Sequence, residues 1–286
     1  MNESGPRAGI DRGRILVGVD GSEDGLRAVT YASTEALVTG GDVWIVHAID
    51  DAAPITGLWD IVSSPEVRRH AADNIVAEAT AVATGLGLPS GRVAGEIVDG
   101  RPSDVLTALS YEAGLLVLGR RSLRGLERLF VGSTSLAAAV RAACPVIVIS
   151  AASTPQRTGA LHSVAVAVST WPVHERALEW GLREAAIREA GLRVLHVVPE
   201  TLGVEGAEFV TVARAGLEDL LAPFRSQHPG VPVEADVLLG DPVAALVGAT
   251  TSVDLMILGV HHDRANLGGA IRAVIAHAHC PVGLIK

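Results

Sequence analysis

The chain has 286 residues, of which 49% are hydrophobic, 19% charged and 3% aromatic, and its net charge is −9 at pH 7. This length suits two domains of about 140 residues better than one, and the negative charge argues against a nucleic-acid partner. The longest apolar runs, such as 115–118, are strand-sized and the segment 1–14 lacks the apolar stretch of a secretory signal, so we expect a cytoplasmic protein without a membrane partner.

Short apolar runs alternate with longer alanine-rich segments of helical spacing, which is typical of parallel strands covered on both faces by crossover helices. In chain order, the first half predicts strand 14–19, helix 23–39, strand 42–48, helix 65–85, strand 92–98, helix 102–112, strand 115–118, helix 133–142 and strand 145–149. The fold is therefore predicted to be a five-stranded, doubly wound α/β sheet. Ser22 and Ser103 are predicted to be N-caps, and Gly40 and Gly85 to close helices.

The second half repeats the landmarks of the first in the same order. The apolar run 14–20 returns at 163–169, which is 149 positions later, and Cys144-Pro-Val returns at Cys280, which is 136 positions later. A duplicated domain explains this order and spacing. The predicted organisation is a tail over 1–13, a first domain over 14–150, a linker over 151–160 and a second domain over 161–286.

The loops that follow the strands carry the candidate chemistry, because ligands of an open α/β sheet bind beyond the carboxyl ends of its strands. Asp20 follows the first strand, and the loop after the fourth strand opens with Gly119, contains four arginines and ends in Gly132-Ser133-Thr134 at a helix start. Glycines, hydroxyls, arginines and a helix N-terminus all suit a polyphosphate. The same residues also fit a plain helix cap beside a solvated arginine face.

A family resemblance favours the first interpretation. The spacing Gly119-x2-Ser122-x9-Gly132-Ser133 resembles the G-x2-G-x9-G-[ST] ATP signature of the universal stress proteins, and Cys144-Pro-Val stands where that family has its equivalent. The resemblance covers both halves, so the chain is identified as a tandem, two-domain member of actinobacterial type. It implies a strand order of 3-2-1-4-5, with a crevice between the first and fourth strands.

The resemblance also implies ATP, or a related adenine nucleotide, as the ligand of the first half. Asp20 would accept hydrogen bonds from the ribose or adenine side and could meet a Mg2+ ion carried with the nucleotide, Gly18 would line the crevice, and the backbone of Ala48 would meet the adenine edge. The loop residues that would enclose the ribose and phosphates are Gly119, Arg120, Ser122, Gly132, Ser133 and Thr134. Ser122 departs from the signature, and serine is costly there if the position needs a positive φ.

The second half departs further from the signature. Ser169 stands in the position of Asp20, and the loop Gly259-x2-His262-x5-Gly268-Gly269 is four residues shorter and lacks the hydroxyls. We expect this half to be empty or to bind very weakly. The family role is that of a nucleotide-dependent regulator in a stress or dormancy response, with an unknown protein partner. An interaction module without nucleotide and a slow ATPase remain as alternatives, although the chain has no Walker-type or hydrolase motif.

Repeated histidines and cysteines indicate packing more than chemistry. His47 and His196 recur at the end of the second strand of each half, which suggests a shared structural role. Cys280 repeats Cys144, so both are interpreted as small apolar residues, and neither a metal site nor a disulfide is predicted. The last strand of each half leaves a sheet edge, and family relatives commonly pair such strands. We therefore expect an intramolecular pseudo-dimer, with a homodimer of whole chains left open.

Overall fold

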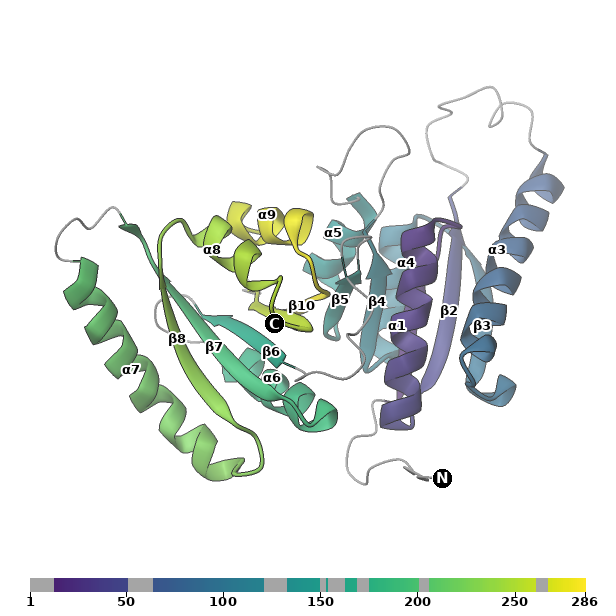
Figure 1. Ribbon diagram of the computed structural model, residues 1–286. Helices are drawn as coiled ribbons and strands as arrows, with labels where there is room; N and C mark the ends of the chain where they lie inside the picture. Colours follow the sequence, from purple (N-terminus) through teal and green to yellow (C-terminus); the bar gives the residue numbers. More distant parts are fainter. Residues whose placement is uncertain are drawn as a thin grey trace. The chain divides into compact units, whose positions relative to one another are not determined.

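The computed structural model describes residues 13–50, 64–120, 133–149, 153, 163–168, 175–200, 206–260 and 267–286. The chain divides into two compact units, Met1–Ala151 and Ala152–Lys286, which are described separately (Figure 1). Within the described ranges, no helix has both the length and the apolar character needed to cross a lipid bilayer.

The first unit is a parallel sheet with a layer of helices on each face. The strand order is β3-β2-β1-β4-β5. Its strands are β1 (Arg14–Gly18), β2 (Asp42–Ile49), β3 (Val93–Asp99), β4 (Leu115–Gly119) and β5 (Val146–Ile149). Its helices are α1 (Glu23–Thr39), α3 (Pro65–Gly85), α4 (Pro102–Leu109) and α5 (Ser133–Arg141), with single 3-10 turns at Ser90–Arg92 and Ser110–Glu112. Helix α1 packs against α3 and α4 packs against α5 (Figure 1), which confirms the predicted doubly wound sheet and its strand order.

The second unit repeats this architecture with the order β8-β7-β6-β9-β10. Its strands are β6 (Ser163–Val168), β7 (Gly191–Val198), β8 (Val233–Leu239), β9 (Leu255–Gly259) and β10 (Val282–Ile285). Its helices are α6 (Glu175–Arg188), α7 (Gly206–Gln227), α8 (Pro242–Ala249) and α9 (Gly269–His277). Matched by sequence, β6 takes the place of β1 and β9 that of β4, so the two sheets have the same connectivity.

The core of each unit lies along its central strands. Ile15, Leu16 and Val17 of β1 are fully buried, because helices cover both faces of the central strands of a parallel sheet. Cys144 and Cys280, which precede the last strands, are buried free thiols, and burial raises the pKa of Cys280 to about 12. Both positions agree with the interpretation of these cysteines as small apolar residues.

Capping residues fix the ends of α1. The side chain of Ser22 accepts a hydrogen bond from the Gly25 amide at 3.1 Å, and the helix ends at Gly40, whose φ is 81°. Only a residue without a side chain adopts this left-handed conformation cheaply. Both predicted caps of this helix are confirmed.

One other predicted cap differs in the structure. Helix α4 begins at Pro102 after Arg101, so the prediction that Ser103 is its N-cap is wrong. Proline fits the first helical position, since it has no amide hydrogen to leave unpaired, and the helix starts two residues earlier than it would after a Ser103 cap. Gly85 is the last residue of α3, whereas the left-handed φ of 94° belongs to Gly87.

Candidate functional site

The strand order reverses at β1, which pairs with β2 on one side and β4 on the other. At the carboxyl end of β1, Gly18 lies opposite Val46 in β2 and Leu118 in β4. The chain then leaves the sheet through Asp20. Parallel strands whose crossovers run in opposite directions leave an opening between the loops at such a point, so this edge is the candidate site.

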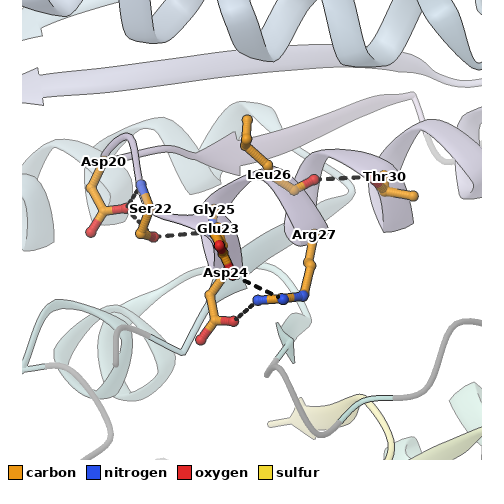
Figure 2. A network of polar contacts seen from close by, with 8 residues as sticks. All are labelled: Asp20, Ser22, Glu23, Asp24, Gly25, Leu26, Arg27 and Thr30. Carbon is orange, nitrogen blue, oxygen red and sulfur yellow. Dashed lines mark hydrogen bonds and ion pairs between the residues drawn. The ribbon is translucent and has the colours of Figure 1, made fainter. Parts of the chain in front are cut away.

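Asp20 is an exposed residue held in place by the start of α1 (Figure 2). Its Oδ1 accepts a hydrogen bond from the Ser22 amide at 3.1 Å and another from the Ser22 hydroxyl. The intervening Gly21 has a φ of 76°, which turns the chain sharply enough for this contact. The turn fixes one oxygen of the carboxylate at the edge of the sheet before any ligand arrives.

Gly25, in the first turn of α1, brings Asp20 and Gly119 together. A Cβ atom at Gly25 would lie 3.4 Å from Oδ1 of Asp20, and a Cβ atom at Gly119 would lie 2.7 Å from the Gly25 amide nitrogen. The end of β4 therefore passes directly against the helix that carries Asp20. Gly119 is required by this packing, in addition to any role toward a ligand.

Helix α5 starts beside the same edge. The Ser135 hydroxyl in its first turn donates to the Gly119 carbonyl at 2.9 Å, so the positive end of the helix lies next to the end of β4. Ser133 and Thr134 are the first two residues of α5. Ser122 and Gly132, the other two loop residues of the predicted site, lie outside the described residues.

Arg120 follows Gly119 and is only 7% exposed. Its amide donates to the carbonyl of Ile149, which extends the pairing of β4 with β5 by one residue. The guanidinium is thus part of the packed edge of the sheet and not a solvated side chain. A buried cation of this kind needs negative charge nearby.

Ala48 and Gly18 lie at the same edge. Ala48 is near the carboxyl end of β2 and pairs with Val98 of β3, one strand away from Asp20. A Cβ atom at Gly18 would lie 2.8 Å from a methyl of Leu118 and 2.9 Å from one of Leu106. Packing against these leucines is sufficient reason for glycine at position 18.

The corresponding edge of the second unit has the same backbone and different side chains. The amide of Val260, which follows Gly259, donates to Ile285 at 2.7 Å, as Arg120 does to Ile149. Gly268 is the N-cap of α9 and makes no side-chain capping bond. Ser169 and His262 lie outside the described residues.

Comparisons with known proteins agree with this duplicated architecture. The family described as "Universal stress protein family" matches twice, over residues 12–150 and 161–286. The chain belongs to the universal stress protein family. A universal stress protein of Mycobacterium tuberculosis is 29% identical over 275 residues, which cover 92% of each chain, and one of Mycolicibacterium smegmatis is 28% identical over 293 residues, which cover 95% of this chain and 96% of the relative.

A solved structure also matches along the whole length. The crystal structure of a universal stress protein from Archaeoglobus fulgidus superimposes with a TM-score of 0.72 and 16% sequence identity, over 97% of each chain. At this identity the likeness shows the fold alone. This universal stress protein therefore shares both its fold and its tandem organisation with other members of the family.

The repeated histidines of this universal stress protein join the first two strands of each sheet. Nδ1 of His47 lies 2.8 Å from the carbonyl oxygen of Val19, and Nδ1 of His196 lies 3.1 Å from that of Val168. A carbonyl only accepts, so Nδ1 carries the proton in both rings. The same bond in both units agrees with a shared structural role.

Asp24 is a charged residue of this site that the motifs did not indicate. Its side chain is 2% exposed, and Oδ1 accepts from Arg27 at 2.7 Å (Figure 2). Its Oδ2 is buried and has no hydrogen-bond partner among the described residues. Burial raises the pKa of Asp24, while the charges of Arg27 and Arg120 lower it. The contact of β4 with the first turn of α1 is what buries Asp24.

Metal-ligand clusters are absent from the described part of the chain, where no three His, Cys, Asp or Glu side chains come together. The histidine pair His261-His262 lies outside the described residues. This edge offers a fixed carboxylate, a helix N-terminus and a buried arginine.

Proposed function

We propose that the first unit binds an adenine nucleotide, ATP in the first place, as a regulatory ligand, and that the second unit binds none or binds it very weakly. The observation that carries this proposal is the convergence of Asp20 and Gly119 on Gly25, at the point where the strand order reverses. This convergence supports a ligand with hydroxyl groups at one end and negative charge at the other.

Each end of that ligand has a chemical counterpart. The exposed carboxylate of Asp20 is a hydrogen-bond acceptor, and ribose hydroxyls are donors that suit it. The first turn of α5 offers backbone amides and the positive end of a helix dipole, which favour phosphate. A Mg2+ ion carried with the nucleotide would take its ligands mainly from phosphate and water.

The second unit lacks these counterparts in its sequence. Serine replaces the aspartate at position 169, and Gly269-Ala270 replace the pair Ser133-Thr134. Because Val260 replaces Arg120 at an equivalent backbone position, the buried positive charge is absent as well. The side chains of the second half therefore support a role in packing, and those of the first half support nucleotide binding.

Regulation is the function that follows best from binding without turnover. The site is built from a carboxylate already committed to Ser22 and a second one bonded to Arg27, which leaves hydrolysis slow at most. Bound ATP would change the surface that a protein partner meets in the cytoplasm during a stress response.

Nucleotide extraction tests binding directly. Acid-extracted protein is expected to release adenine nucleotide, and calorimetry is expected to show one ATP per chain. Asp20→Asn keeps the Oδ1 acceptor for Ser22 and removes the charge, so we expect its affinity to fall by roughly tenfold or more. Ser169→Ala, the matched change in the second half, should leave the affinity unchanged.

The opposite results would favour the alternatives. Protein that releases no nucleotide and gives no binding heat would support an interaction module without a ligand. Equal affinities of wild type and Asp20→Asn would remove Asp20 from the site. Phosphate release above background that Asp20→Asn abolishes would instead indicate a slow ATPase.

Limited proteolysis tests the regulatory step. Trypsin cleaves after arginine, and four arginines stand between Gly119 and Gly132 in the sequence. We expect saturating ATP to slow cleavage in this segment of the wild type and not in Asp20→Asn. Equal cleavage of the wild type with and without ATP would contradict an ATP-dependent surface.

A further inference from the structure

Asp24 is buried directly under the end of β4. A Cβ atom at Gly119 would lie 2.5 Å from the carbonyl carbon of Asp24 and 2.6 Å from its carbonyl oxygen. This contact covers the first turn of α1 and removes the Asp24 side chain from solvent. A carboxylate placed there loses most of its hydration, which is costly unless nearby positive charge compensates.

Two arginines supply that compensation. Arg27, one turn further along α1, donates to Oδ1 of Asp24 at 2.7 Å and also to the exposed Glu23 at 3.1 Å (Figure 2). Arg120, at the end of β4, acts on Asp24 through its charge. No described residue forms a hydrogen bond with Oδ2 of Asp24, so this oxygen depends on the electrostatic field of its surroundings. Asp20 adds a second negative charge to that field.

The second half of the chain replaces this pair of charges with two valines. Val173 stands 149 positions after Asp24, and Val260 stands 140 positions after Arg120, the offsets that relate the surrounding landmarks. Val260 is 6% exposed and makes the same backbone bond as Arg120. Since a buried valine serves the fold at the position that matches Arg120, the buried charge at that position in the first half needs a reason beyond folding.

We propose that Asp24 is a positioning residue of the nucleotide site: its buried carboxylate holds the charge of Arg120 at the end of β4, and it takes up a proton when a bound phosphate takes over that charge. The inference rests on the proposed function, because it needs an anion beside Arg120. It adds a residue outside the ATP signature and a measurable linkage between nucleotide and proton.

The sign of the linkage follows from the charges. Burial already raises the pKa of Asp24 in the ligand-free protein, and Arg120 opposes this rise. A phosphate paired with Arg120 cancels the opposing charge and adds negative charge, so the pKa of Asp24 rises further in the complex. Between the two pKa values the complex holds more protons than the free protein, and ATP affinity falls as the pH increases through this window.

Calorimetry in two buffers of different ionisation enthalpy measures the protons taken up as ATP binds. Asp24→Asn keeps an acceptor for Arg27 and cannot titrate. Because ATP itself titrates near neutral pH, the quantity compared is the difference between wild type and Asp24→Asn, measured at a series of pH values above the ordinary aspartate pKa of 3.8. We expect wild type to take up an additional fraction of a proton, on the order of 0.5 per ATP at its maximum.

Two further variants serve as controls for this result. The side chain of Glu23, the other partner of Arg27, is 83% exposed. The Glu23→Gln variant should therefore take up as many protons on ATP binding as wild type does. The double variant Asp24→Val/Arg120→Val has the two valines that the sequence of the second half carries at the matching positions. We expect this variant to fold and to take up no additional protons when ATP binds. Equal uptake by wild type and Asp24→Asn would overturn the proposal.

A ligand-free measurement separates this inference from the proposed function. Carboxyl-carbon NMR should show Asp24 titrating at a higher pH in Arg120→Val than in wild type, because the compensating charge is gone. An unchanged titration would overturn the positioning role whether or not ATP binds. Absence of ATP binding to wild type would overturn the proposed function and the proton uptake together.

Discussion

The ends of β4 and β9 have the same backbone arrangement and opposite chemistry. Arg120 and Val260 each donate an amide to the last strand of their unit, yet one side chain is a buried cation and the other a buried aliphatic group. The fold accepts both. This difference teaches that the fold does not require the charges around Asp24, which makes a ligand the better explanation for them.

A second pair of charges differs between the halves but has a simpler explanation. Asp104 of α4 and Arg141 of α5 form an ion pair at 2.6 Å, with side chains 56% and 45% exposed. The positions that match them in the second half are Ala244 and His277. Exposed pairs contribute little and cost little, so their presence in one half needs no ligand. Asp24 and Arg120 are buried, whereas Asp104 and Arg141 are exposed. This difference in burial is why only the first pair of charges indicates a ligand.

The largest expected effect tests the contact between β4 and α1. Gly119→Ala puts a Cβ atom 2.5 Å from the Asp24 backbone, where no flexible side chain can give way. We expect it to lower the free energy of unfolding of the first unit by about 3 kcal/mol, measured by urea denaturation. Gly216→Ala in α7 meets open space and should raise stability by about 0.5–1 kcal/mol. A neutral Gly119→Ala would contradict the close contact.

The second-largest expected effect on stability tests the difference between the N-caps of α4 and α8, which have equivalent backbone positions. Asp241 caps α8 by accepting from the Ala244 amide at 2.8 Å, whereas Arg101 precedes α4 with nearly the same φ and ψ and makes no such bond. We expect Asp241→Ala to cost about 1 kcal/mol and Arg101→Asp to stabilise the first unit by a similar or smaller amount. Thermal melts of the two variants check both signs, and a destabilising Arg101→Asp would show that the two positions are not equivalent.

The smallest effect concerns the exposed ion pair. The hydrogen bond from Arg141 holds the pKa of Asp104 below its ordinary value of 3.8, so its stabilisation is present above that pH and is lost as the pH falls through the folded-state pKa. Urea denaturation should show Arg141→Gln slightly less stable than wild type at neutral pH and equal to it at the acidic end. A large difference at neutral pH would place this pair among the important charges of the first unit.

Periodicity and caps were enough to predict most of the first unit. Helices 23–39 and 65–85 have the predicted bounds, because Ser22 and Ser64 both act as side-chain caps. The predicted helix 102–112 ends at Leu109 and continues as a 3-10 turn, where the hydroxyl of Ser110 accepts from the Ala143 amide. A bond over such a sequence distance is invisible to a local pattern.

The candidate site was less predictable for the same reason. Asp20 and Gly119 were found because they follow strands at positions that parallel topology brings to one edge. Asp24 was missed, since its importance comes from burial by a residue 95 positions away in the sequence. A comparison of the two halves contained a signal: aspartate and arginine are exchanged together for two valines.

The two buried cysteines provide each unit with its own reporter. Only the thiolate reacts with alkylating reagents and oxidants, and a thiol with a pKa near 12, as at Cys280, is almost never in that form while it stays packed. Labelling of either cysteine therefore requires its unit to open. Mass spectrometry distinguishes peptides containing Cys144 from those containing Cys280, so the opening rates of both halves can be followed in a single sample of the unmodified protein.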